Sequence, residues 1–349
     1  MTTTAERPVV ALTLGDPAGI GAELIARLLA GPEAAQRANI VLVGDPWLWE
    51  EGQRIAGVRV ATDAVDSLDA VRDRADTARP AFLAMDTVAQ AEVVRSRAQA
   101  IGGRSVLRVL DLCMDAALAG TIDAICFAPL NKQAMKIGGM QHEDELHHFA
   151  EHLGVTGYFC EFNTLGELWT SRISSHVPLK DVAGYLSVER IQQAAELIYR
   201  SLLASGVAQP KVAIAAFNPH GGDGGLCGRE EVDTIVPAVQ ALQARSWPTD
   251  SPFHGPFPAD TIFLKAQAGE YQAVVTMYHD QGQIAIKLLG FSRGVTVQGG
   301  LPIPITTPAH GTAYDIAGQG KASVEAMSHA FQIACRMGAA QREKSLAAA

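Results

Sequence analysis

Short runs of apolar residues alternate along this chain with longer segments in which apolar residues recur at helical spacing, and this alternation restricts the fold more than any other feature. The runs that predict buried strands lie at residues 9–14, 40–43, 81–84, 122–128, 212–217, 273–277 and 294–297. The segments that predict helices lie at residues 20–29, 106–118, 188–203, 229–244 and 324–337. Such alternation is typical of an α/β fold with a mainly parallel sheet covered on both faces.

The length of 349 residues fits about two domains of ordinary size. A hydrophobic fraction of 48% and a charged fraction of 19% indicate a globular protein with a packed core. No stretch has the composition of a linker, so we expect interleaved domains. The prediction is a terminal α/β domain of residues 1–135 plus 290–349 and a central α/β domain of residues 136–289.

Charge and cysteine content exclude several classes of protein. The net charge of −9 disfavours a nucleic-acid partner. No run approaches the 18 or so apolar residues of a membrane span, and the first residues lack the pattern of a secretory signal. The five cysteines are scattered, with no Cys-x-x-Cys pair, which argues against a disulfide framework and a thiolate zinc site. We therefore expect a cytoplasmic protein.

Three histidines each stand at the end of an apolar run: His176, His220 and His279. Neutral imidazoles suit zinc, cobalt, nickel or manganese ions, and three protein ligands leave coordination positions open for a substrate. Any one of these histidines could instead cap an element or lie satisfied in the core. Their shared position at strand–loop junctions favours the metal interpretation.

Two glycine-containing loops also follow strands. The first holds Gly15, Asp16 and Gly19 and opens a helix, where backbone N–H groups favour an anion. It lacks the Gly-x-Gly-x-x-Gly pattern, Asp16 would repel a naked phosphate, and a plain tight turn explains its spacing equally well. The second runs from His310 to Gly320 and is richer in specific side chains than a surface turn needs.

Three further polar sites allow more than one interpretation. Asp260 could orient a metal-ligating histidine or cap the helix that begins there. Lys287 follows His279 by two helical turns and on its own would be a solvent-exposed lysine. The segment 142–152 contains four histidines among acidic residues, which favours a polar helix start near a substrate over a second metal site.

Taken together, these segments resemble the 4-hydroxythreonine-4-phosphate dehydrogenase family from about Val9 to Met337. The most specific motifs are Leu14-Gly15-Asp16-Pro17-Ala18-Gly19-Ile20-Gly21, Ala128-Pro129-Leu130-Asn131-Lys132, Asn218-Pro219-His220, Pro258-Ala259-Asp260-Thr261, Tyr278-His279-Asp280-Gln281-Gly282 and His310-Gly311-Thr312-Ala313. The last loop is also similar to the adenine-side loop of isopropylmalate and isocitrate dehydrogenases, whose fold the family shares. The resemblance therefore implies that two-domain fold, with the active site in the interdomain cleft.

The resemblance implies a homodimer whose active site lies near the subunit interface. It assigns one divalent ion (Zn, Co, Mn or Mg) to His176, His220 and His279, with one ligand from the partner subunit. It also implies NAD or NADP as hydride acceptor and a substrate contact for Lys287. We expect the cofactor to be bound by Gly15, Asp16, Gly19, His310, Gly311, Thr312 and Asp315.

The chain departs from the family at its expected substrate contacts. The family's His-Thr-Glu motif is absent, and His147 and His148 stand in the corresponding stretch. Thr296 replaces a substrate-contacting Asn, and Ile305 replaces an Arg that would grip phosphate or carboxylate. The chain is therefore expected to be a divergent paralogue with a different small anionic substrate, such as a four-carbon sugar-acid phosphate or an aromatic cis-dihydrodiol carboxylate.

The expected reaction is oxidation of a secondary alcohol with hydride transfer to the nicotinamide. The metal would lower the pKa of the substrate hydroxyl, and Asp260, Asp280 and Lys287 are unranked candidates for the general base. Decarboxylation would follow if the product is a β-keto acid. The alternative from another class is a non-catalytic paralogue that only binds a metabolite.

Overall fold

The computed structural model describes residues 7–290 and 293–348, and it divides into two compact units. The first contains both ends of the chain, residues 1–156, 295–297 and 301–349, and the second contains residues 157–294 and 298–300. Each unit alternates strands with helices, which confirms the predicted α/β class. Every one of the seven strand predictions and five helix predictions overlaps an observed element of the same type.

The strands of the first unit are β1 (Val9–Thr13), β2 (Asn39–Gly44), β3 (Asp63–Val65), β4 (Ala81–Ala84), β5 (Ala124–Phe127), β12 (Ile305–Pro308) and, for its first three residues, β11 (Val295–Gly299). Their order is β3-β4-β2-β1-β5-β12-β11. All neighbours pair in parallel except β11, which runs antiparallel to β12. The carboxyl ends of β1, β5 and β12 therefore meet at one edge of the sheet.

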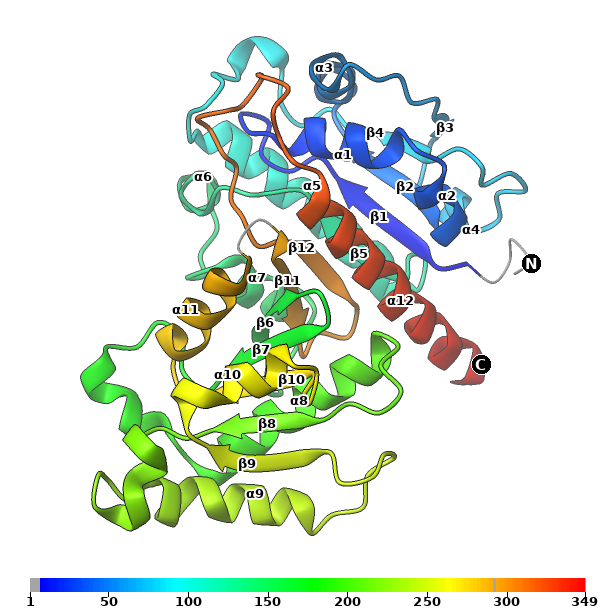
Figure 1. Ribbon diagram of the computed structural model, residues 1–349. Helices are drawn as coiled ribbons and strands as arrows, with labels where there is room; N and C mark the ends of the chain where they lie inside the picture. Colours follow the sequence, from blue (N-terminus) through cyan, green and yellow to red (C-terminus); the bar gives the residue numbers. More distant parts are fainter. Residues whose placement is uncertain (1–6, 291–292, 349) are drawn as a thin grey trace. The chain divides into compact units, whose positions relative to one another are not determined.

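The helices of the first unit are α1 (Gly21–Leu29), α2 (Glu33–Arg37), α3 (Pro46–Ala56), α4 (Asp69–Arg72), η2 (Gln90–Glu92), α5 (Ala100–Leu118), α6 (Lys132–Gly138), α7 (Glu145–His152) and α12 (Glu325–Ala348). Both α5 and α12 lie against the central strands (Figure 1). The polar residues Asn131 and Asp144 begin α6 and α7 by accepting the backbone N–H groups of Ala134 and His147.

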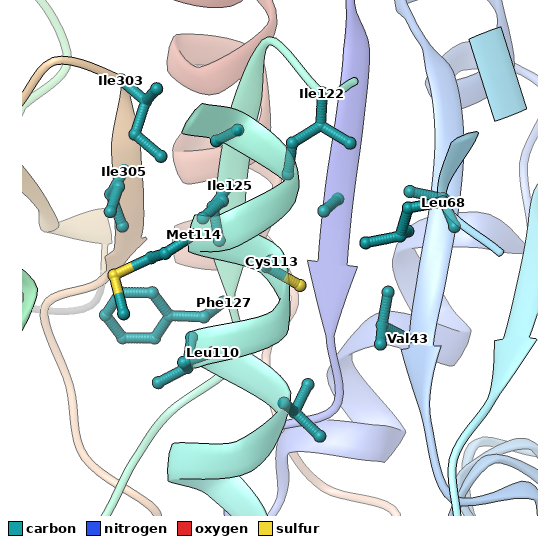
Figure 2. Close-up of a cluster of buried hydrophobic side chains, with 14 of the residues drawn as sticks. Val43, Leu68, Leu110, Cys113, Met114, Ile122, Ile125, Phe127, Ile303 and Ile305 are labelled. Carbon is teal, nitrogen blue, oxygen red and sulfur yellow. The ribbon is translucent and has the colours of Figure 1, made fainter. Parts of the chain in front are cut away.

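The core of the first unit fills the space between α5 and the sheet. Figure 2 shows Met114 of α5 beside Phe127 of β5, with Ile303 and Ile305 on the neighbouring segment. The strands are apolar on nearly every residue because both faces are covered, as expected for a parallel sheet.

The strands of the second unit are β6 (Cys160–Leu165), β7 (Leu168–Arg172), β8 (Val212–Ala215), β9 (Phe253–Phe257) and β10 (Ala273–Thr276). Their order is β6-β7-β10-β8-β9. The strands β7, β10, β8 and β9 are parallel to their neighbours, and β6 is antiparallel to β7. The helical segments are η3 (Leu179–Tyr185), α8 (Val188–Ala204), η4 (Pro219–Gly225), η5 (Glu231–Ile235), α9 (Val236–Gln243), α10 (Ala259–Gln267) and α11 (His279–Gly290).

The sequence did not predict β3, β6, β7, β9 or β12. The strand β3 is only three residues long, and the other four contain polar residues, glycine or proline within the strand. No helix within residues 7–290 and 293–348 is both long enough and apolar enough to cross a bilayer.

Candidate active site

The three candidate metal ligands lie at the carboxyl ends of three adjacent parallel strands. His176 follows β7, His279 begins α11 after β10, and His220 follows β8. In the second unit, β10 pairs in parallel with β7 on one side and with β8 on the other. The topology thus brings all three histidines to one edge of one sheet, which is where open α/β sheets bind ligands.

These histidines do not converge within a single chain. Adjacent strands are about 4.8 Å apart, so residues after β7 and β8 begin about 10 Å from each other. Across residues 7–290 and 293–348, the only group of three potential ligands whose atoms all lie within 4.8 Å of one another is Glu143, Asp144 and His147. His176 and His220 are exposed, and the His279 side chain is 38% exposed. One chain therefore presents the three imidazoles without completing a site.

His279 is oriented by its neighbours. Its Nδ1 lies 2.8 Å from Oδ1 of Asp280, which leaves Nε2 for another partner. A carboxylate on one ring nitrogen is the usual arrangement of a metal-ligating histidine, because it fixes the tautomer and the ring orientation. Gln281 anchors the same turn: its amide donates to the Ala216 carbonyl at 2.8 Å and accepts from the Met277 N–H at 2.8 Å.

His220 lies in an unusual backbone turn. Five consecutive residues, from His220 (φ 55°) to Gly224 (φ 64°), have left-handed backbone angles. For a residue with a Cβ this conformation costs roughly 1–2 kcal/mol, so it persists only where surrounding contacts impose it. Here the carboxylate of Glu231 accepts the backbone N–H groups of Phe217 and Asn218, each at 2.7 Å.

His176 follows a buried arginine. Arg172, at the end of β7, donates to Ser175 Oγ at 2.7 Å, to Asn163 Oδ1 at 2.8 Å and to Glu161 Oε2 at 2.8 Å. The bond to Ser175 ties the residue before His176 to the strand. Neither Arg172 nor Glu231 was predicted from sequence.

The two glycine-containing loops of the first unit pack against each other. The Ile20 N–H donates to the Thr312 carbonyl at 3.2 Å, and a Cβ on Gly19 would lie only 3.0 Å from Thr312 Cβ. The Tyr314 hydroxyl donates to Asp16 Oδ2 at 2.8 Å. Gly15, at φ +72°, lies so close to Pro129 that a Cβ would be 2.6 Å from its carbonyl oxygen. Loops that follow β1, β5 and β12 thus form one assembly at the carboxyl edge.

Asp16 is a structural part of this assembly. Its side chain accepts the Ala18 N–H at 2.8 Å in addition to the Tyr314 hydroxyl, and the residue is 3% exposed. Burial raises the pKa of Asp16 above its ordinary value of 3.8, and the two hydrogen bonds oppose that shift. Thr312 is buried, whereas Gly311 and Asp315 are exposed and His310 is partly exposed, with Nδ1 3.0 Å from the Gly311 carbonyl.

The candidate general bases differ in their surroundings. Asp260 is exposed in the first turn of α10, and its side chain does not cap that helix. Asp280 is engaged with His279, as described above. Lys287 is exposed on α11, eight residues after His279 and so about 12 Å further along the helix axis.

The candidate substrate contacts fall into three environments. Ile305 is fully buried in the core of Figure 2, so as placed its side chain has no surface from which to contact a substrate. Thr296 is 8% exposed and pairs with Thr307 across β11 and β12. His147 and His148 lie in α7, where His147 Nδ1 is 2.7 Å from Asp144 and His148 Nε2 is 2.9 Å from Asp111.

The histidines around α7 are all paired with acids. His152 Nε2 lies 2.8 Å from Asp115, and His142 contacts Glu151. Burial would raise the pKa of Asp144, but hydrogen bonds and charge from His147 outweigh it and hold the value below 3.8. These histidines thus have acidic partners within the chain, and Glu143, Asp144 and His147 also lie close enough together to hold a metal ion.

Solved structures resemble the whole chain. A 4-hydroxythreonine-4-phosphate dehydrogenase from Klebsiella pneumoniae superimposes with a TM-score of 0.80 at 32% identity, covering 95% of this chain and 98% of that one. A terephthalate 1,2-cis-dihydrodiol dehydrogenase from Burkholderia xenovorans gives a TM-score of 0.67 at 25% identity over 94% and 98%. The fold and these likenesses place this chain among the α/β dehydrogenases, oxidoreductases that act on a CH–OH group.

The family follows from the sequence. The family model of the pyridoxal phosphate biosynthetic protein PdxA matches residues 36–334. A Pseudomonas aeruginosa protein provisionally named 4-hydroxythreonine-4-phosphate dehydrogenase 2 is 55% identical over 333 residues, 95% of this chain and 97% of that protein. An Oceanobacillus iheyensis protein provisionally named D-threonate 4-phosphate dehydrogenase is 32% identical over 335 residues, 95% and 99%. This chain belongs to the PdxA family, which confirms the resemblance carried by its motifs.

Proposed function

We propose that this chain oxidises the secondary alcohol of a small phosphorylated hydroxy acid, with NAD or NADP as hydride acceptor and a divalent ion held by His176, His220 and His279. The observation that carries the proposal is the position of the three histidines at the ends of adjacent parallel strands, with His279 Nδ1 on Asp280. The donors are all imidazole nitrogens, which suits zinc or cobalt better than magnesium.

The ion, when bound, would act as a Lewis acid on the substrate hydroxyl. Groups of the protein orient the ligand: Asp280 fixes the His279 ring, and Gln281 anchors the turn that carries His279. Because Asp280 is already engaged with His279, we favour Asp260 as the group that accepts the hydroxyl proton; Lys287 ranks behind it, because an ammonium group has no lone pair with which to accept a proton. A proton acceptor must be within hydrogen-bond reach of its substrate, and both side chains are exposed at the surface of the second unit.

The cofactor is proposed to bind at the carboxyl edge of the first unit. The assembly of Gly15, Gly19 and Thr312 brings glycine backbone to a helix N-terminus, which favours a pyrophosphate. His310, Gly311 and Asp315 present exposed groups beside it. The buried carboxylate of Asp16 supports this assembly through Tyr314 and Ala18, so it faces the loop interior instead of a phosphate.

The active species is proposed to be a homodimer in which the partner supplies one histidine. Two observations support this. The three histidines do not meet within one chain. The helix that starts at His279 also exposes large apolar side chains: Ile284 is 59% exposed and Leu288 is 83% exposed. Apolar side chains exposed one turn apart on a helix are typical of a contact surface.

The names of the relatives indicate the class of substrate. Two relatives are named for 4-hydroxythreonine-4-phosphate and for D-threonate 4-phosphate, and both compounds are four-carbon phosphate esters. We favour such a phosphate ester, with decarboxylation if the product is a β-keto acid. The aromatic cis-dihydrodiol carboxylate is the second candidate, supported by the likeness to the terephthalate enzyme. A cytoplasmic location remains a prediction.

The test is a hydride-transfer assay with purified protein, NAD and NADP, and both metal-loaded and chelator-treated samples. The panel should include 4-hydroxythreonine-4-phosphate, D-threonate 4-phosphate, their unphosphorylated forms and an aromatic cis-dihydrodiol carboxylate. We expect turnover of a phosphate ester, loss of turnover with chelator, and close to one ion per chain. Absence of reduced cofactor with every substrate would favour the non-catalytic alternative.

A further inference from the structure

We infer that Glu231 is the positioning residue of the reaction: it holds the His220 turn in its left-handed form, ready to receive the metal ion. The inference rests on the proposed function, since it takes His220 as a ligand. It adds a residue that lies eleven positions further along the chain and acts through the backbone of the turn.

The His220 turn has few backbone bonds of its own: the Gly221 N–H donates to the Asn218 carbonyl at 3.1 Å, and the Cys227 N–H donates to the Gly222 carbonyl at 3.0 Å. From His220 to Gly224 the backbone remains at positive φ, and two of these five residues, His220 and Asp223, carry a Cβ. Positive φ is unfavourable for such residues, so a further contact from outside the turn would stabilise this conformation. His220 itself is exposed, which excludes packing of its own side chain as that contact.

Glu231 contacts the turn at both its start and its middle. One carboxylate oxygen accepts the N–H groups of Phe217 and Asn218 at 2.7 Å each, and the other accepts the Asn218 amide at 2.9 Å. That second oxygen also packs against Gly222, where a Cβ would lie 2.6 Å from it. The carboxylate thus fixes residues on either side of His220.

Glu231 is itself firmly placed. It is 2% exposed and begins the π-helical turn η5 that leads into α9. A buried carboxylate is stable only when several donors satisfy it, and here three do.

Glu230 offers a matched control. It precedes Glu231 on the same turn and carries the same charge, but it makes one bond to this loop, to the Asn218 amide at 2.6 Å. It touches neither backbone N–H group. If negative charge near the histidines were the cause, Glu230→Gln and Glu231→Gln would both weaken zinc binding. If Glu231 positions the turn, only Glu231→Gln should weaken it.

The experiment compares apo protein of four forms: natural, Glu230→Gln, Glu231→Gln and Glu231→Ala. Zinc affinity is measured by competition with a chromophoric chelator, and hydrogen exchange is measured at the amides of Phe217, Asn218 and Gly221. We expect Glu231→Ala to weaken zinc binding by about 10–100-fold and to speed exchange at these amides. Glu231→Gln should fall between Ala and the natural protein, because its remaining oxygen can still accept from the backbone.

Turnover separates positioning from simple loss of structure. At saturating zinc, Glu231→Ala should recover a kcat close to that of the natural protein, whereas a His220→Ala variant should not. Natural zinc affinity and natural exchange in both Glu231 variants would overturn the inference. If the natural protein binds no divalent ion but Glu231→Ala alone speeds exchange at residues 217–221, the proposed function fails while the role of Glu231 in shaping the turn stands.

Discussion

The glycine loops of the first unit and the histidine turns of the second lie at equivalent places, the carboxyl edges of parallel strands, but they differ in how complete they are. In the first unit, Asp16, Tyr314 and Thr312 satisfy one another and are largely shielded from solvent. In the second unit, His176 and His220 project into solvent. Polar and charged side chains behind them hold the backbone, and the imidazoles themselves do not meet.

This difference is what the proposed dimer predicts for the two regions. A cofactor loop can be built from backbone and buried hydrogen bonds alone, so its geometry is already present. A metal site that shares its ligands between two subunits leaves those ligands exposed in each separate chain. Contacts that fix the backbone turns then hold the ligands in position. We therefore expect changes in the first region to affect stability and changes in the second to affect activity.

The largest effect should come from a histidine of the second region. His220→Ala removes an exposed side chain, so the fold should survive, but turnover should fall by roughly a thousandfold or more because the ion is lost. Metal content by mass spectrometry and the thermal unfolding midpoint measure the two properties. His152→Ala, in a paired histidine of the first unit, is the control and should keep its metal. Full metal occupancy in His220→Ala would refute its role as a ligand.

The next effect concerns Ile305, where an Arg would restore the side chain that the family resemblance leads one to expect. Because Ile305 is fully buried among Ile125, Phe127 and Met114, Ile305→Arg should cost about 3–5 kcal/mol of unfolding free energy or prevent folding. Ile305→Val should cost only about 0.5–1.5 kcal/mol. Denaturant titration measures both. A stable Ile305→Arg protein with improved turnover of 4-hydroxythreonine-4-phosphate would show that this side chain does reach a substrate.

The strands and the positions of the histidines were predicted from the sequence to different extents. Strands such as β1 and β5 are uniformly apolar, so their pattern predicted them; β7 ends in Arg172 and β9 contains Gly255 and Pro256, so only tertiary pairing reveals them as strands. The motif histidines were placed at strand ends because each follows an apolar run.

The tertiary contacts that shape the site could not be predicted from the sequence. That Glu231 would reach back to Phe217, or that Tyr314 would meet Asp16 across 298 positions, depends on tertiary folding that no local pattern encodes. For Ile305 the family resemblance predicted a substrate contact. The side chain is fully buried, however, and packs in the core of the first unit.

A smaller effect should follow from Tyr314→Phe in the first region. The change removes the hydrogen bond to the buried Asp16 carboxylate, which should cost about 1.5–3 kcal/mol of stability. The KM for the nicotinamide cofactor should rise, and metal content should stay the same. Tyr185→Phe, at an exposed tyrosine of the second unit, is the control for loss of a hydroxyl. If Tyr314→Phe leaves both the KM for the cofactor and the unfolding free energy unchanged, the proposed coupling of the two loops is wrong.

The smallest effect is a pH dependence of stability at Glu231. Burial would raise the pKa of Glu231, but hydrogen bonds from Asn218 and Phe217 outweigh it, so the folded value lies below the ordinary 4.5. A lowered carboxyl pKa contributes stability above pH 4.5 that is lost as the pH falls through the folded value. The natural apo protein should therefore exceed Glu231→Gln in unfolding free energy at pH 6, by about 1 kcal/mol, and the gap should shrink toward pH 3. A gap independent of pH would contradict this assignment.

The most direct test of the account is complementation between subunits, because it asks whether one chain can complete the histidine site. Three inactive variants, His176→Ala, His220→Ala and His279→Ala, are mixed in all three pairs after dissociation and verified subunit exchange. If one ligand comes from the partner, half of the dimers in a mixture are mixed and each of these has one intact site, so activity should recover to about a quarter of the natural value. Recovery should occur in two pairs, those that include the variant of the partner-supplied histidine, and not in the third. No recovery in any pair would mean that each site is built within one chain, and would contradict the account.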